Sequence, residues 1–164
     1  MSAYAKAVLL NRAGGLINAC CAFFFFLNNI LKVKNLENAI NLAEKVGHVF
    51  VATADAAGMP HLAAAAQIRS ASEDRVAVSA WFCPGTVENL EQNRRISLVV
   101  WDPPSDRGYQ LLGEVVQVEE ASVMNGFSPE AEKSSPMPQV ERRLMVQVTR
   151  ILAFSHAPHS DLEE

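Results

Sequence analysis

The chain contains few of the residues on which several large classes of protein depend. Only three of its 164 residues are cysteines, and Cys20, Cys21 and Cys83 show no CxxC or Cys/His spacing typical of a zinc site. We expect them to be small buried hydrophobic residues in a protein of the reducing cytoplasm. The net charge is only −4, from 14 basic and 18 acidic residues, which argues against a broad surface for nucleic acid.

Short motifs for common catalytic sites are also missing. The sequence has no G-x-S-x-G elbow, no G-x-G-x-x-G run and no Walker sequence, so the machinery of a hydrolase is not visible. His48 and His61 have no other metal-ligating residues near them in the sequence, and the acidic residues are dispersed. We therefore predict no metal centre and assign no catalytic residue.

A long hydrophobic run is absent too, although the amino-terminal segment comes close to one. Residues 13–27 read AGGLINACCAFFFFL, which is shorter than the roughly 18 to 20 apolar residues of a membrane helix. No small-x-small cleavage site follows the phenylalanines, as a secretory signal would require. We interpret residues 1–33 as a hydrophobic extension, either an added helix or a segment upstream of the domain. An interface helix and membrane association are less favoured alternatives that the sequence leaves open.

After this extension the sequence has the pattern of one mainly β domain at 34–156, followed by a polar tail at 157–164. Hydrophobic residues make up 49% of the chain, which is enough to bury a core. The domain opens with a helix at 36–46, which we expect to begin after the N-cap Asn35 and to end at Gly47.

Beyond that helix the hydrophobic period changes to two, which is typical of strands. Six strands are predicted, at 48–55, 61–70, 75–82, 96–101, 109–119 and 142–154. One short helix at 87–92 interrupts them, and the proline-rich stretch 127–139 is predicted to be a loop. Several short strands with a single helix between them indicate a small antiparallel barrel.

The segment from Ser79 to Asn89 is the one stretch with a specific physical implication. A strand ends, Pro84 and Gly85 break it, and a helix is predicted to begin at Thr86. A helix N-terminus offers unbonded N–H groups and the positive end of the helix dipole, which suits a phosphate group. Thr86 could donate its hydroxyl to that phosphate or simply cap its own helix, and the sequence alone favours the cap.

Three stretches in a fixed order carry a resemblance to a known family. They are VFVATADAAGMPHLAAA at 49–65, RVAVSAWFCPGTVENLEQNRRISLVVWD at 75–102 and GYQLLGEVVQVEE at 108–120. Their order resembles that of the pyridoxamine 5′-phosphate oxidase-like family of FMN-binding split barrels, and of its short stand-alone members in particular. The resemblance implies a six-stranded antiparallel split β-barrel of Greek-key type.

The same resemblance implies a cofactor site and a homodimer. In that family FMN lies at the dimer interface, with its phosphate at the start of the short helix. Carried over by position, the site would comprise Ala64, Ala65, Ala66, Ser79, Ala80, Trp81, Gly85 and Thr86. The three alanines would face the flavin through their main chain, residues 79–81 would line the ring or ribityl side, and Gly85 and Thr86 would hold the phosphate.

Two departures from the family pattern affect this expectation. Family members often have Lys or Arg where this chain has Gly85, and Arg69, Arg94 or Arg95 are candidates to replace that charge. Polar or aromatic side chains commonly stand where this chain has Ala63–Ala66, and the alanines could widen the pocket for a deazaflavin or haem.

Two functions from different classes therefore remain. One is an FMN-dependent oxidoreductase acting on a small molecule that the sequence does not identify. The alternative is a non-catalytic dimeric carrier, storage or sensor protein for flavin, deazaflavin or haem.

Overall fold

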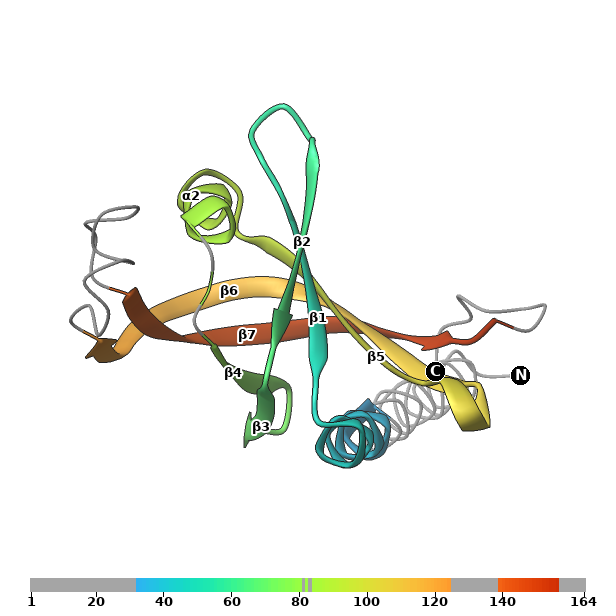
Figure 1. Ribbon diagram of the computed structural model, residues 1–164. Helices are drawn as coiled ribbons and strands as arrows, with labels where there is room; N and C mark the ends of the chain where they lie inside the picture. The colour runs from blue at the N-terminus through green and yellow to red at the C-terminus, as the bar shows by residue number, and fades with distance from the viewer. Residues whose placement is uncertain (1–31, 81, 83, 125–138, 157–164) are drawn as a thin grey trace, which may run out of the picture.

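The computed structural model describes residues 32–80, 82, 84–124 and 139–156. Within these residues seven strands form one antiparallel sheet, in the order β2-β1-β5-β6-β7-β4-β3. A helix occupies residues 32–46 and adjoins the start of β1, while α2 lies beside the β1–β2 hairpin (Figure 1). The other elements are β1 Val49–Ala54, β2 Pro60–Ala65, β3 Gln67–Ser72, β4 Arg75–Ala80, α2 Pro84–Gln92, β5 Arg95–Asp102, the 3-10 helix η1 Pro103–Ser105, β6 Arg107–Met124 and β7 Gln139–Phe154.

The first helix begins earlier than the sequence suggested. Asn35 lies within it, so the prediction of Asn35 as its N-cap was wrong. Its end was predicted correctly: Gly47 adopts a φ of +79° and donates its N–H to the carbonyl of Ala43, which is the usual way for glycine to stop a helix. Leu36, Ile40 and Ala43 are buried on one face, as the helical period predicted.

The turn between β1 and β2 is fixed by the carboxylate of Asp55. Its Oδ1 accepts hydrogen bonds from the main-chain N–H groups of Ala57 at 2.9 Å and Met59 at 2.8 Å. Gly58 takes a φ of +87°, which side chains disfavour, and donates to the Asp55 carbonyl. The Asp-x-x-Gly-x-Pro stretch is therefore the hairpin turn between β1 and β2.

The strand count differs from the prediction because one expected strand is two. Residues 61–70 were predicted as a single strand, but the chain bends at Ala66 between β2 and β3. β2 pairs with β1, whereas β3 pairs with β4 at the other edge of the sheet. The burial pattern records the break, because Ala65 and Ile68 both face the core although they are three residues apart, not two. The antiparallel split barrel is confirmed, with seven strands in place of six.

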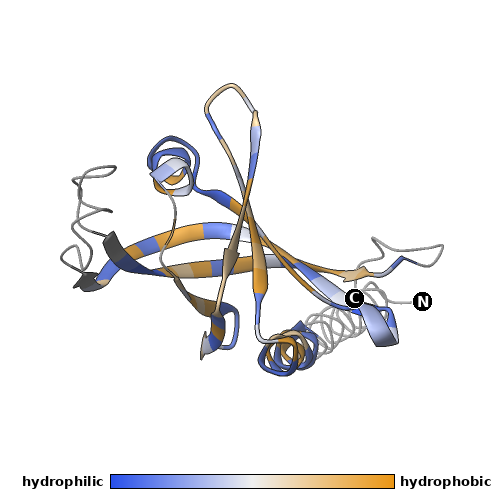
Figure 2. Ribbon diagram, viewed as in Figure 1, coloured by the Kyte–Doolittle hydropathy of each residue, from blue (hydrophilic) through white to orange (hydrophobic). Residues whose placement is uncertain are grey.

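The core fills the inside of this curled sheet. Alternate residues of β1, β4, β5 and β7 are almost fully buried, as a sheet with one face in the core requires, and hydrophobic residues recur along these strands in Figure 2. β6 keeps the alternation as far as Val115, after which Val116 and Val118 are exposed. Gly113 marks an irregularity in the pairing of β6 with β7, and a Cβ there would collide with the Gln147 carbonyl oxygen.

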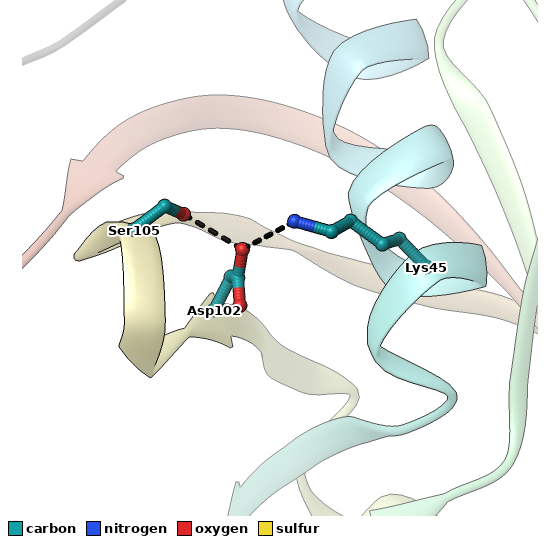
Figure 3. A network of polar contacts seen from close by, with 3 residues as sticks. All are labelled: Lys45, Asp102 and Ser105. Carbon is teal, nitrogen blue, oxygen red and sulfur yellow. Dashed lines mark hydrogen bonds and ion pairs between the residues drawn. The ribbon is translucent and has the colours of Figure 1, made fainter.

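A polar contact ties the first helix to the end of β5. Lys45 Nζ lies 2.6 Å from Asp102 Oδ2, and the Ser105 hydroxyl donates to the same oxygen at 2.7 Å (Figure 3). The residue Asp102 is only 7% exposed, although Lys45 reaches into solvent. These hydrogen bonds from Lys45 and then Ser105 lower the pKa of Asp102 below its ordinary value of 3.8.

This contact makes a pH-dependent contribution to stability. Because the folded pKa of Asp102 is depressed, the contribution is present above pH 3.8 and is lost as the pH falls through the lower folded pKa. We expect Asp102→Asn to be less stable than wild type at about pH 7 and about pH 5, with the gap narrowing by about pH 3. Urea unfolding at the three pH values measures this. Glu37→Gln, which alters an exposed carboxylate of the same helix, is the control, and a gap that did not depend on pH would contradict the expectation.

Candidate functional site

The short helix α2 starts earlier than predicted. It begins at Pro84, where the sequence analysis expected a break before a helix that would start at Thr86. Proline is favoured at the first position of a helix because its missing N–H would have no helical partner there. Thr86 is the third helical residue and is wholly buried, so it is not the N-cap of α2.

Two asparagines attach α2 to β1. Asn89 Nδ2 donates to the hydroxyl oxygen of Thr53 at 3.1 Å, and Asn93 Nδ2 donates to the carbonyl of Ala54 at 3.3 Å. Leu90, between them, enters the core. The Thr-x-x-Asn-Leu-x-x-Asn spacing therefore sets one face of α2 against the sheet, and this contact fixes where the first turn of the helix points.

The first turn of α2 lies against the beginning of β2. Gly85 is half-buried, and a Cβ built on it would lie 3.7 Å from Cε1 and 3.8 Å from Nε2 of His61. The first turn contains no acidic residue. The N-terminal end of the helix dipole is therefore not neutralised by a carboxylate of that turn, and an imidazole stands beside it.

The predicted site residues lie on three elements that contact one another. α2 contacts β2, and β2 in turn contacts β4. On β2 and the bend after it, Ala64 and Ala66 are exposed, whereas Ala65 is buried. On β4, Ser79 is half-buried and Ala80 is buried. Trp81 falls outside the described residues.

The three arginines that were candidates to replace a basic residue at position 85 do not lie on the first turn of α2. Arg94 and Arg95 follow the last turn of α2, so a nine-residue helix of about 13 Å separates them from its start. The Arg94 guanidinium donates to the carbonyls of Val115 at 3.1 Å and Val116 at 3.4 Å, which binds it to β6. Arg69 belongs to β3 and lines a hollow of about 280 Å³ with Glu44 and Gly47.

A larger hollow of about 610 Å³ lies over β1, β5, β6 and β7. It is lined by Ala52, Thr53, Ala54, Asn93, Arg95, Ile96, Ser97, Leu112, Gly113, Glu114, Thr149 and Arg150. The pairing of these strands puts several apolar side chains in neighbouring rows of the outer sheet face, with Ala52 beside Leu62 on one side and beside Ser97 on the other. Leu62 is 62% exposed, so this face presents apolar surface to its surroundings.

A third hollow, of about 250 Å³, separates α2 from the long β6–β7 hairpin. Its apolar floor includes Phe82, Val87 and Leu144, and its rim carries an ion pair of Arg142 with Glu120 at 3.9 Å. Among the described residues no cluster of three or more His, Cys, Asp or Glu side chains could hold a metal ion. No helix in that part of the chain is long and apolar enough to cross a membrane.

Within the described residues these features define a class of protein: a split antiparallel barrel in which one α-helix, α2, lies between β4 and β5 in the sequence and has its first residue exposed. A family model described as pyridoxamine 5′-phosphate oxidase matches residues 37–153, well over half of the chain. The protein belongs to this family, as the sequence resemblance predicted.

Solved structures support the fold. An FMN-binding protein from Syntrophomonas wolfei is similar with a TM-score of 0.55 at 15% identity, covering 87% of this chain and 99% of that one. HupZ of Group A Streptococcus matches with a TM-score of 0.52 at 19% identity, covering 77% and 97%. A Clostridium acetobutylicum protein related to general stress protein 26 matches with a TM-score of 0.52 at 19% identity, covering 76% and 90%. No curated protein matches the sequence.

Sequence reasoning missed His61 as a neighbour of the predicted site. It treated this histidine only as a metal ligand without company, whereas the structure sets the imidazole beside Gly85. The sequence feature that could have placed His61 was its position in the hairpin, because residues paired across two strands have side chains on the same face. His61 pairs with Thr53, whose side chain faces α2, so His61 had to lie on the same side of the strands.

The attachment of α2 can be tested by removing one asparagine. We expect Asn89→Ala to lower the free energy of unfolding by about 1 to 2 kcal/mol, because Thr53 is only 4% exposed and loses this hydrogen bond. Urea unfolding measures the loss, and Gln92→Ala, in the exposed last turn of α2, is the matched control with an effect below about 0.5 kcal/mol. A double-mutant cycle with Thr53→Val should show coupling, and strict additivity would contradict the attachment.

Proposed function

We propose that this protein binds FMN, with the flavin phosphate at the first turn of α2, and that it is a homodimeric flavin-dependent oxidoreductase acting on a small molecule. The observation that carries the proposal is the exposed start of α2 in a chain of this family, with Gly85 half-buried and no acidic side chain in the first turn. Main-chain N–H groups at a helix N-terminus are good ligands for a phosphate dianion.

The donor set at this position fits a phosphate. Gly85 leaves room for a ligand to approach the main chain, and the neighbouring His61 imidazole adds an N–H donor. Thr86 is buried behind Gly85, so Gly85 is the residue of this pair that a ligand can reach directly. The direct phosphate contact suggested for Thr86 stays a prediction.

The remaining part of the proposed site follows β2 and β4. β2 is an edge strand of the described sheet, so one side of its main chain can bond to the planar ring system of a ligand. Ala64 and Ala66 are exposed there, while buried Ala65 and Ala80 contribute through packing. Ser79 and Trp81 complete the proposed set. When bound, FMN supplies the hydride or electron chemistry, and the protein supplies position and electrostatics.

A second copy of the chain is the proposed partner. The outer sheet face around Leu62, Ala52 and Leu112 is apolar, and a homodimer would cover it. The cofactor would then lie beside the interface, because β2 contributes to both surfaces.

The alternative function is a non-catalytic binding protein for flavin, deazaflavin or haem. It is favoured by the titratable groups of the described residues, where the carboxyls with lowered pKa values, Asp74 and Asp102, have structural partners in Gln147 and Lys45. Neither is placed to act as an acid or base at the start of α2, since Asp74 lies between β3 and β4 and Asp102 ends β5. Anaerobic addition of NADH or NADPH separates the two functions, because a reductase bleaches its flavin and a carrier does not.

Flavin titration tests the proposal. We expect FMN to bind at about one per chain and riboflavin, which lacks the phosphate, to bind at least about tenfold more weakly. Gly85→Asp should weaken FMN binding by about tenfold or more and leave riboflavin nearly unchanged, because the new carboxylate repels the phosphate. An aspartate is also tolerated in the first turn of a helix, so the variant should fold.

Gly85→Ala separates volume from charge: its Cβ makes only ordinary contacts with His61 and adds no charge, so any loss of FMN affinity in Gly85→Asp beyond that in Gly85→Ala is due to the carboxylate. Fluorescence quenching of the flavin measures each dissociation constant, and sedimentation measures the dimer. A colourless protein that ignores added FMN would refute flavin binding. A haem absorption band in the purified protein would instead support the haem-binding alternative.

A further inference from the structure

Among the described residues, the imidazole of His61 lies beside the start of α2. Its Cε1, Nε2 and Nδ1 atoms all lie within 4.0 Å of the position that a Cβ of Gly85 would occupy. His61 is half-buried in β2, opposite Thr53, whose hydroxyl oxygen accepts the hydrogen bond from Asn89 of α2. β2, which carries His61, and α2, which carries Gly85, are therefore held in fixed positions relative to each other.

The first turn of α2 needs a charged or polar partner from outside the helix if it is to hold a dianion tightly. Gly85 has no side chain, and the helix has neither an acidic residue in its first turn nor a basic one in its last. Arg94 is bonded to the β6 main chain and Arg95 lies at the same far end. One hydrogen bond to an ionised group changes the affinity by about tenfold or more, so a single partner from outside the helix has a measurable effect.

We propose that His61 is the residue through which this protein distinguishes a phosphorylated flavin from an unphosphorylated one, by donating an imidazole N–H to the phosphate at the start of α2. The inference rests on the proposed function and assigns a specificity-determining residue to that site. It also explains how the chain can dispense with a basic residue at position 85, because the imidazole approaches the same place from β2.

The test compares FMN with riboflavin in wild type and in His61→Phe, which keeps a planar ring but removes both nitrogens. We expect the variant to bind FMN about tenfold more weakly and riboflavin within about twofold of wild type. His48→Phe is the matched control, because His48 is also half-buried but lies against Phe50 at the start of β1. It should leave both dissociation constants unchanged.

A second set of variants, made in a protein that carries Gly85→Lys, makes the test more specific. Gly85→Lys places an ammonium group on the first turn, and its Cβ fits beside the imidazole at 3.7 Å. In this background His61→Phe should cost less FMN affinity than in wild type, because the lysine replaces the lost partner. His61→Gln, which retains an N–H donor, should fall between wild type and His61→Phe and covers the case in which phenylalanine impairs folding.

The outcomes separate this inference from the proposed function. If wild type binds FMN but His61→Phe binds it equally well, or loses FMN and riboflavin affinity to the same extent, the role of His61 is refuted and flavin binding stands. If wild type binds no FMN, the proposed function fails and the assignment of His61 fails with it.

Discussion

The closure of the barrel depends on one short segment, β2 and β3, which forms both edge strands of the sheet. Residues of β2 pair with β1, and after the bend at Ala66 the residues of β3 pair with β4. A strand that leaves one partner and joins another must change direction between two residues, and small side chains allow the tight packing that this needs. Without the bend, β3 and β4 would not return to the edge opposite β2, and the inner faces of β1 and β4 would not share one core.

The β1–β2 hairpin before this bend also positions α2. Because β2 is held against β1 and β1 is held to α2 by Asn89 and Asn93, the β1–β2 hairpin and α2 meet although they are separated in sequence. Two other polar contacts hold elements of the fold together. Lys45 joins the first helix to Asp102, and Arg94 joins the end of α2 to β6. The start of α2 differs from these places because its main-chain donors have no carboxylate in the same turn.

Much of this arrangement was predictable from the sequence, and the exceptions have definite causes. The helix end at Gly47 was predicted because glycine readily adopts the backbone conformation that stops a helix. The hairpin turn at Asp55–Pro60 lies at the boundary of two predicted strands, and Asp and Gly are typical turn residues. The strand break at Ala66 was missed because four consecutive alanines show no alternation of polar and apolar residues. Only the three-residue spacing between buried Ala65 and buried Ile68 reveals it. The early start of α2 was missed because Pro84 both ends strands and begins helices. The candidate site was placed by the order of motifs, whereas the neighbourhood of His61 and Gly85 is a tertiary contact that local pattern does not encode.

The two surfaces of β2 connect the proposed dimer with the proposed phosphate site. Side chains alternate along a strand, so Leu62 and Ala64 face outward over the apolar sheet face while His61 faces α2. A second copy seated on the outer face would restrain the edge strand that carries His61. In the proposed dimer, dimerisation and flavin binding would therefore both order β2. Each of the two would then strengthen the other.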